Sequence, residues 1–310
     1  MLRRRQMTKI SKPIIIVGTG RCGSTVFHRL LARHHRTMWL SGLSDRFPAR
    51  PSWNRSAVSA MHRPLLRRLL GHRIQPSEAY FFWDHYAYGF SAPCRDLVRA
   101  DVSARVRKQV RAALESQLTS RHDRLLLKIT GWPRIGYLRE IFEDARFIHI
   151  VRDGRAVASS LLHVDFWRGW QGPHGWRAGL LSPEDQASWE GHDRSFTALA
   201  GLEWRIQMRA IDAARQDLDP AQFLELRYED FCREPWETCR RALQFAELPE
   251  SPEFERQVRA EPIRDMTNRW RRDLSQAQQN LLDDLLREDL PRYGYQVADR
   301  PEPVHAAAGG

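Results

Sequence analysis

The sequence lacks any long apolar run. None of its uninterrupted apolar stretches approaches the roughly 20 residues that a membrane-spanning helix needs. The basic residues 1–12 lead directly into a β-branched run and contain no apolar core or cleavage site of a secretory leader. With 310 residues, 42% of them hydrophobic and 28% charged, the chain can bury a full core. We therefore expect a soluble, cytoplasmic protein without a membrane span.

Cysteine is scarce, and its spacing is uninformative. The four cysteines contain no Cys-x-x-Cys pair and have no histidine partners at zinc-site spacing. The 12 histidines contain no His-Glu-x-x-His pattern either. These absences predict no metal site, and free thiols in a reducing compartment.

Acidic residues are too few to balance the basic ones, and the formal net charge is +11. Such an excess raises the alternative of a non-catalytic nucleic-acid-binding protein. The basic residues are scattered, however, and no known nucleic-acid-binding motif accompanies them. A basic balance also suits a small polyanionic ligand, so charge alone leaves the two alternatives open.

Short apolar runs alternate with helical patterns along most of the chain. The runs that are typical of buried strands are Ile14–Val17, Leu125–Ile129, Phe147–Val151 and Phe223–Leu226. The helical patterns are Thr25–His34, Val102–Thr119, Ile135–Phe142, Arg155–His163, Phe196–Leu218, Pro235–Ala246 and Ser275–Glu288. This order predicts an α/β three-layer sandwich with a central parallel sheet. We expect one domain over residues 13–298, a basic arm at 1–12 and a flexible tail at 299–310.

Two tryptophan-containing stretches do not fit the sheet pattern. They run from Trp39 to Pro93 and from Asp165 to Trp189. Long irregular segments in compact domains are commonly functional, and a high tryptophan content argues against disorder. We expect helical or irregular insertions on the acceptor side of the site. Their tryptophans would either stack on a substrate or simply pack as a lid.

The loop after the first strand is typical of a phosphate cradle. Its residues are Gly18, Thr19, Gly20, Arg21, Cys22, Gly23, Ser24 and Thr25. Glycines at this spacing let backbone N–H groups turn inward, and the following helix adds its positive dipole end. An ATP-binding P-loop has lysine where this chain has Ser24, and here the cation lies within the loop at Arg21. An ATP-dependent P-loop kinase remains an alternative that this missing lysine disfavours.

A second candidate anion site follows the third predicted strand. Arg152 stands just after that strand, Asp153-Gly154 makes a turn, and Ser160 lies eight residues after the arginine on the next helix. Ligands of open α/β sheets bind outside the carboxyl ends of the strands. A nucleotide with phosphates at both ends of its ribose needs two such sites, whereas a triphosphate needs one site and magnesium.

These motifs together resemble the sulfotransferases that use 3′-phosphoadenosine 5′-phosphosulfate (PAPS). Residues 20–25 resemble the 5′-phosphosulfate loop of that family, and residues 151–160 resemble its 3′-phosphate motif. Residues 127–134, 227–231 and 267–271 are similar to further family segments, so the resemblance spans about residues 13–295. It implies a P-loop-like fold and metal-independent, in-line transfer of a sulfuryl group from PAPS. The acceptor would be a hydroxyl or amine of a carbohydrate, lipid or small metabolite, with no nucleic-acid partner.

The resemblance also implies roles for individual residues. Arg21 and Lys128 would contact the transferred group and its leaving oxygen, as catalytic residues. The residues implied in binding the nucleotide are Gly20, Arg21, Cys22, Gly23, Ser24, Thr25, Arg152, Ser160, Tyr228, Thr267 and Arg269.

The catalytic base is the point at which this chain departs from its relatives. Many of them carry a glutamate about twenty residues after the loop arginine, where this chain has Trp39-Leu-Ser-Gly-Leu-Ser-Asp45. Asp45 is the nearest acid, and Asp84 and His85 in the aromatic cluster 80–86 are further candidates. A histidine near its ordinary pKa suits removal of a proton from an alcohol.

Overall fold

The computed structural model describes residues 8–92, 95–172, 176 and 178–297. The predicted tail and residues 1–7 of the predicted arm lie outside these residues. A parallel sheet in the order β2-β3-β1-β4-β5 forms the centre of the molecule. Its strands are β1 (Ile14–Gly18), β2 (Thr37–Trp39), β3 (Arg124–Thr130), β4 (Arg146–Val151) and β5 (Phe223–Arg227).

Helices cover both faces of the sheet. The helices of the first half are α1 (Ser24–Leu31), α2 (Gly42–Arg46), α3 (Pro51–Met61), α4 (Pro64–Leu70), α5 (Tyr80–Tyr86), α6 (Ala104–Glu115), α7 (Ile135–Ile141) and α8 (Gly154–Leu161). Those of the second half are α9 (Pro183–Glu190), α10 (Phe196–Gln216), α11 (Tyr228–Arg233), α12 (Pro235–Phe245), α13 (Pro252–Arg259), α14 (Trp270–Asp273) and α15 (Gln276–Leu285). Short 3-10 turns are η1 (Arg99–Asp101), η2 (Gly169–Gln171), η3 (Pro220–Gln222) and η4 (Leu290–Tyr293).

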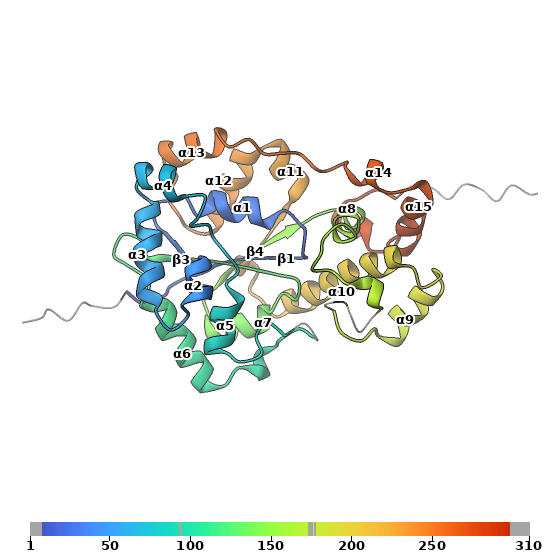
Figure 1. Cartoon of the computed structure of the whole chain (residues 1–310), viewed down its shortest axis with the longest axis horizontal. Coiled ribbons are helices and arrows are strands. Elements are labelled where there is room, and N and C mark those ends of the chain that lie inside the picture. The colour runs from blue at the N-terminus through green and yellow to red at the C-terminus, as the bar shows by residue number, and fades with distance from the viewer. Residues whose placement is uncertain (1–7, 93–94, 173–175, 177, 298–310) are drawn as a thin grey trace, which may run out of the picture.

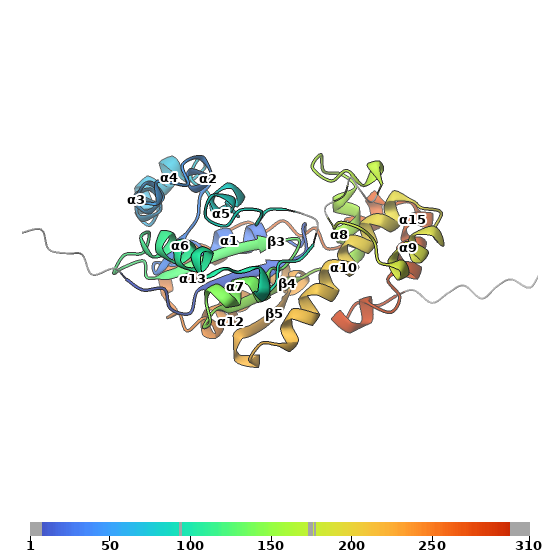
Figure 2. The ribbon, with the colours of Figure 1, turned by 90° about the horizontal axis from the view of Figure 1, so that it is seen from below.

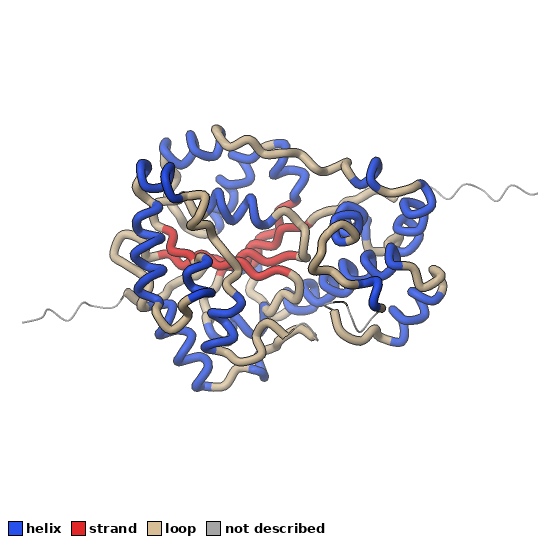
Figure 3. Tube along the Cα trace, viewed as in Figure 1, coloured by secondary structure: helices blue, strands red, loops and turns tan. Residues whose placement is uncertain are grey.

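The three predicted layers are confirmed. In Figures 1 and 3 the strands lie between α1 and α12 on one side and α7 and α10 on the other. All five residues of β1 are buried, because each face of a central parallel strand packs against helices. The four predicted strands are present, each within one residue of its expected ends.

The structure adds one strand that was not predicted and shows that the first insertion is helical, one of its two expected forms. β2 is a three-residue strand at the edge of the sheet, paired only with β3, and three residues give too short a pattern to detect. The stretch from Trp39 to residue 92 contains four helices, α2 to α5. Figure 2 shows these helices as an extra layer above the sheet, at the upper left, with the loop after α8 rising beside them at the upper right.

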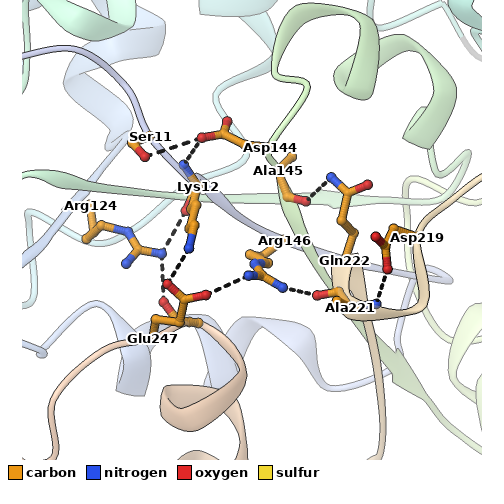
Figure 4. Close-up of polar contacts among 11 residues, drawn as sticks. Ser11, Lys12, Arg124, Asp144, Ala145, Arg146, Asp219, Ala221, Gln222 and Glu247 are labelled. Carbon is orange, nitrogen blue, oxygen red and sulfur yellow. Dashed lines mark hydrogen bonds and ion pairs between the residues drawn. The ribbon is translucent and has the colours of Figure 1, made fainter.

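The amino edge of the sheet is closed by a polar network (Figure 4). Arg124, at the start of β3, donates to the carbonyls of Lys12 and Ala246 at 2.8 and 2.7 Å. Arg146, at the start of β4, donates to Glu247 at 2.6 Å, and Glu247 also accepts from the Lys12 ammonium. Protein groups therefore pair with the cations at this edge.

Candidate active site

The loop between β1 and α1 is shaped by two residues in the left-handed region. Arg21 has φ 67° and Gly23 has φ 87°. A Cβ atom on Gly23 would lie 2.3 Å from the Tyr228 ring, so only glycine fits there. A Cβ atom on Gly20 would meet nothing within 4 Å, because this residue lines an open cavity. The loop thus packs on Tyr228 with one side and leaves the other open.

The remaining loop residues differ in exposure. Cys22 is fully buried, and burial raises the pKa of its thiol, so this side chain is a neutral packing group. Ser24 is buried at the start of α1, and both Ser24 and Thr25 line the cavity. The α1 N-terminus, with its free N–H groups, therefore faces the open space.

Two arginines without carboxylate partners meet at the carboxyl edge of the sheet. The Arg21 Nε atom donates to Ser160 Oγ at 2.9 Å, and Arg152 donates to the carbonyls of Arg21 and Met266, both at 2.9 Å. In the described part of the chain, neither guanidinium has a carboxylate within 4 Å. Burial, and then the charge of Arg152, lowers the pKa of Arg21.

A cavity of about 240 Å³ adjoins these arginines and is lined by Ser160 and by Met266 and Arg269 on the far side. The Arg152 Nε atom is buried and has no hydrogen-bond partner. A buried cationic group of this kind is costly unless an anion completes it. The loop arginine, Arg152 and Ser160, which were predicted from separate motifs, therefore lie together at one corner of the sheet edge, where they could bind an anion.

The other predicted nucleotide-binding residues, Tyr228, Arg269 and Thr267, differ in their partners and in whether they line a cavity. The Tyr228 ring lies beneath Arg152, with the guanidinium carbon 4.4 Å from the ring centre. Arg269 lines the cavity but is ion-paired to Asp273 at 2.6 Å. The backbone N–H of Thr267 donates to Asp265 at 2.8 Å, and Thr267 lines neither of the two cavities described here.

Lys128 connects the loop to an acid that the sequence analysis missed. Its ammonium lies 2.9 Å from Thr25 Oγ1 and 2.8 Å from Glu78 Oε1. Glu78 also accepts a hydrogen bond from Thr130 Oγ1 at 2.8 Å. The two residues line a cavity of about 420 Å³, which Arg21 and Arg152 border. The cavity thus holds a carboxylate, a buried lysine and the loop arginine around one space.

None of the three predicted candidates for the base lines this cavity. Asp45 accepts from the backbone N–H of Phe81 at 2.9 Å, and Asp84 accepts from the N–H and hydroxyl of Ser91 at 2.9 and 2.5 Å. The exposed His85 packs edge-on against Tyr86. The two acids hold the ends of α5 in place, while His85 lies on its exposed side.

Glu78 reaches the site because the insertion is fixed to the end of the sheet. Ser41 bridges to Pro76, and the N–H of Ser77 donates to the Leu40 carbonyl at 2.8 Å just beyond β2. This contact joins residues more than thirty positions apart and has no sequence signature. One available signal is that Glu78 is the only acid between residues 46 and 83.

The far wall of the cavity is built from aromatic and polar side chains: Tyr80, Trp132, Phe166, Glu203 and Gln207. Of the tryptophans in the two insertions, Trp39, Trp83, Trp167 and Trp176 are buried, and only Trp53 and Trp170 are strongly exposed. Trp167 donates to Glu203 at 2.5 Å, so it supports the wall from behind. In the described residues, no group of three metal-ligating side chains is placed to hold an ion.

Comparison with known proteins agrees with this geometry. A curated relative, the omega-hydroxy-beta-dihydromenaquinone-9 sulfotransferase Stf3 of Mycobacterium bovis, is 31% identical over 193 residues. The match covers 57% of this chain but only 42% of that protein, so the chain spans less than half of its relative's length.

Two solved structures share the fold. Sulfotransferase STF9 from Mycobacterium avium has a TM-score of 0.57 at 19% identity, with 94% of this chain and 79% of that chain covered. The sulfotransferase domain from the curacin biosynthetic pathway has a TM-score of 0.52 at 13% identity, with 94% and 100% covered. The model of the sulfotransferase family matches residues 13–253, which contain the loop, Glu78, Lys128 and Arg152. This chain belongs to the sulfotransferase family.

Proposed function

We propose that this protein transfers a sulfuryl group from PAPS to a hydroxyl or amine of an acceptor molecule. The observation that carries the proposal is the pair of arginines at the carboxyl edge, which lack carboxylate partners among the described residues. One belongs to the loop after β1 and the other follows β4. A nucleotide with phosphates on both sides of its ribose matches two separate cationic sites.

The residues present fit such a nucleotide. Arg152 and Ser160 would bind the 3′-phosphate, because the unpartnered Nε atom of Arg152 needs an acceptor. The backbone N–H groups of residues 20–25 and the hydroxyls of Ser24 and Thr25 would bind the 5′-phosphate beside the open side of Gly20.

Arg21, Lys128 and Glu78 are the proposed catalytic residues. Sulfuryl transfer requires alignment of acceptor and leaving group, and stabilisation of charge on the leaving oxygen. The two cations border the space beside the loop and can supply that stabilisation. Glu78 is the acid on the acceptor side of Lys128, and as general base it would take the proton of the acceptor hydroxyl.

The curated relative is named as an omega-hydroxy-beta-dihydromenaquinone-9 sulfotransferase, so the acceptor given in that name carries a hydroxyl. The cavity of this protein is lined by the polar residues Glu78 and Thr130 and by the aromatic residues Trp132 and Phe166. These features support a hydroxyl acceptor that carries apolar surface.

A thermal-shift comparison of 3′,5′-ADP, Mg-ATP and a DNA duplex tests the proposal. A ligand at a hundredfold excess over its Kd adds about 2.7 kcal/mol to the free energy of unfolding. We expect 3′,5′-ADP alone to give such a shift, in the presence of EDTA as well as without it. A shift with Mg-ATP but none with 3′,5′-ADP would support the P-loop kinase instead. A shift with DNA alone would support the nucleic-acid-binding alternative.

A further inference from the structure

Helix α4 is an apolar and basic helix that packs on α3 and leaves its outer face exposed. None of its residues is buried, and Leu65 and Leu69 have 78% and 66% of their surface exposed. Residues four apart lie on the same face of a helix, so the two leucines form one apolar ridge. Exposed apolar surface next to basic residues is typical of interaction sites and of helices that lie in a membrane interface.

The charge around this helix is of one sign. Residues 46–77, which contain α3 and α4, hold seven arginines and no aspartate or glutamate. Among them, Arg63, Arg68 and Arg73 are exposed, and none of the three has a carboxylate partner among the described residues. The segment therefore carries seven of the chain's eleven formal excess charges.

A groove of about 380 Å³ lies beside α4. Its floor contains Trp39, Met61 and Ile74. Its rim carries four arginines, of which Arg33 is paired to Glu261 and Arg67 is bonded to Gln257. Arg29 and Arg68 have no carboxylate within 4 Å in the part of the chain that the structure describes. An anionic headgroup with an attached acyl chain matches such a basic rim and apolar floor.

Two segments that line the catalytic cavity lie on the same side of the molecule as α4. Figure 2 shows α3, α4 and α5 along its upper edge, with the loop after α8 at the same height. Tyr80 of α5 and Phe166 of that loop line the cavity, while Phe81 of α5 and Trp170 of the loop are 72% and 59% exposed. Exposed apolar residues thus occur on α4 and on both of these cavity-lining segments.

We propose that this face, formed by residues 46–77 with Phe81 and Trp170, docks on a bilayer that contains anionic phospholipid. The leucine ridge of α4 would enter the interface while the arginines contact lipid phosphates. A nucleic acid would leave the aliphatic ridge without a partner, and a symmetric dimer through this face would bring seven like charges against seven. Docking would present the cavity to molecules held in the membrane. That the acceptor is a membrane-held molecule rests on the proposed function, whereas the docking itself does not.

Vesicle co-sedimentation of the full chain tests the docking. Vesicles of phosphatidylcholine alone are compared with vesicles containing one quarter phosphatidylglycerol, at 50 and 500 mM NaCl. We expect binding to the anionic vesicles that weakens at high salt. Arg63→Glu with Arg68→Glu should lower the partition coefficient by roughly tenfold or more. Leu65→Ser with Leu69→Ser should lower it by a similar factor.

Arg241→Glu with Arg292→Glu is the matched control, because it changes the net charge equally at exposed sites outside the segment. Arg241 belongs to α12, which lies at the lower edge of Figure 2. Equal binding of the control and the Arg63/Arg68 variant, or equal binding to both kinds of vesicle, would overturn the proposal. The proposal would also be overturned if the wild type did not bind vesicles but self-associated or bound an oligonucleotide, and if the α4 variants abolished that binding.

Binding of 3′,5′-ADP is measured on every variant by thermal shift. We expect it to be unchanged, which also shows that the variants are folded. If the wild-type protein binds 3′,5′-ADP but does not bind vesicles, the docking proposal alone is refuted. Vesicle binding without any 3′,5′-ADP binding would refute the proposed function alone.

Discussion

The two edges of the sheet carry the same kinds of cation with different partners. At the amino edge, Arg146 shares Glu247 with Lys12, and Arg124 donates to two buried carbonyls (Figure 4). At the carboxyl edge, Arg21 and Arg152 have only neutral oxygens of a hydroxyl and carbonyls as partners. A carboxylate thus pairs with Lys12 and Arg146 at the amino edge, whereas among the described residues Arg21 and Arg152 have no carboxylate within 4 Å and are available to an anionic ligand.

This difference is one reason to place the proposed nucleotide site at the carboxyl edge. Strand ends at either edge offer room for arginines, so residue type alone does not separate structural cations from binding ones. Arg155 shows the same distinction within a few residues of Arg152, because two aspartates, Asp153 and Asp283, bind its guanidinium. Partner chemistry therefore favours Arg152 over Arg155 as the proposed binding residue.

The largest expected effect is a loss of activity on substitution of Glu78, the acid that pairs with Lys128 in the cavity at the carboxyl edge. Glu78→Gln should lower kcat by roughly 10²–10⁴, because the amide can no longer accept the acceptor's proton. The amide oxygen can still accept from Lys128, so 3′,5′-ADP affinity should be unchanged. Steady-state rates of labelled sulfate transfer measure the first quantity, and thermal shift measures the second.

Asp84→Asn is the matched control for this change, because Asp84 bonds only Ser91 and does not line the cavity. A kcat for Glu78→Gln within threefold of the wild type would remove Glu78 from the reaction. If the Asp84 variant is folded but inactive, Asp84 of α5 would again be a candidate for the catalytic base.

The second-largest effect is on nucleotide affinity, which should fall on substitution of an arginine at the carboxyl edge but not at the amino edge. Arg152→Ala should weaken 3′,5′-ADP roughly 10- to 100-fold, the usual cost of lost charged hydrogen bonds, while 5′-AMP affinity changes much less. Arg146→Ala, the control at the amino edge, should change neither. Isothermal titration with both nucleotides measures the four affinities. Equal losses of the two nucleotides on Arg152→Ala would contradict the assignment of the 3′-phosphate.

The sequence predicted the proposed nucleotide-binding part of the site better than the part that would face the acceptor. The loop after β1 and the turn after β4 are local patterns attached to buried strands, so residues 20–25, Arg152 and Ser160 could be proposed as binding residues from spacing together with the family resemblance. Their mutual contact, from Arg21 Nε to Ser160 Oγ, follows from the parallel pairing of β1 with β4. Parallel pairing places the ends of both strands at one edge.

Glu78 could not be predicted in this way, because its position depends on contacts between an insertion and the end of β2. Such contacts join distant residues and leave no periodic pattern. The bounds of α3 and α4 were not predicted either. Both are short helices within a stretch for which the sequence predicts only helical or irregular structure.

A smaller effect on stability is expected from the buried arginine of the amino edge. Arg124→Ala should lower the free energy of unfolding by about 2 kcal/mol, because the carbonyls of Lys12 and Ala246 lose their donor. Affinity for 3′,5′-ADP should remain that of the wild type. Urea unfolding and the nucleotide titration test the two statements. A loss of affinity without a loss of stability would mean that the amino edge also serves the ligand.

The smallest expected effect is the pH dependence of the exposed pair at the amino edge. The Lys12 ammonium, through its hydrogen bond, lowers the pKa of Glu247 from its ordinary value of 4.5. A lowered folded-state pKa means that the stabilisation is complete above the ordinary value and is lost as the pH falls through the folded one. The difference in Tm between the wild type and Glu247→Gln should therefore be constant from pH 7 to 5 and shrink below about 4.5. Because the carboxylate is exposed, 0.5 M NaCl should also reduce the difference. A Tm difference that grows on acidification would show that Glu247 is stabilised in its protonated form, and the amino edge would then not be held by charge pairing.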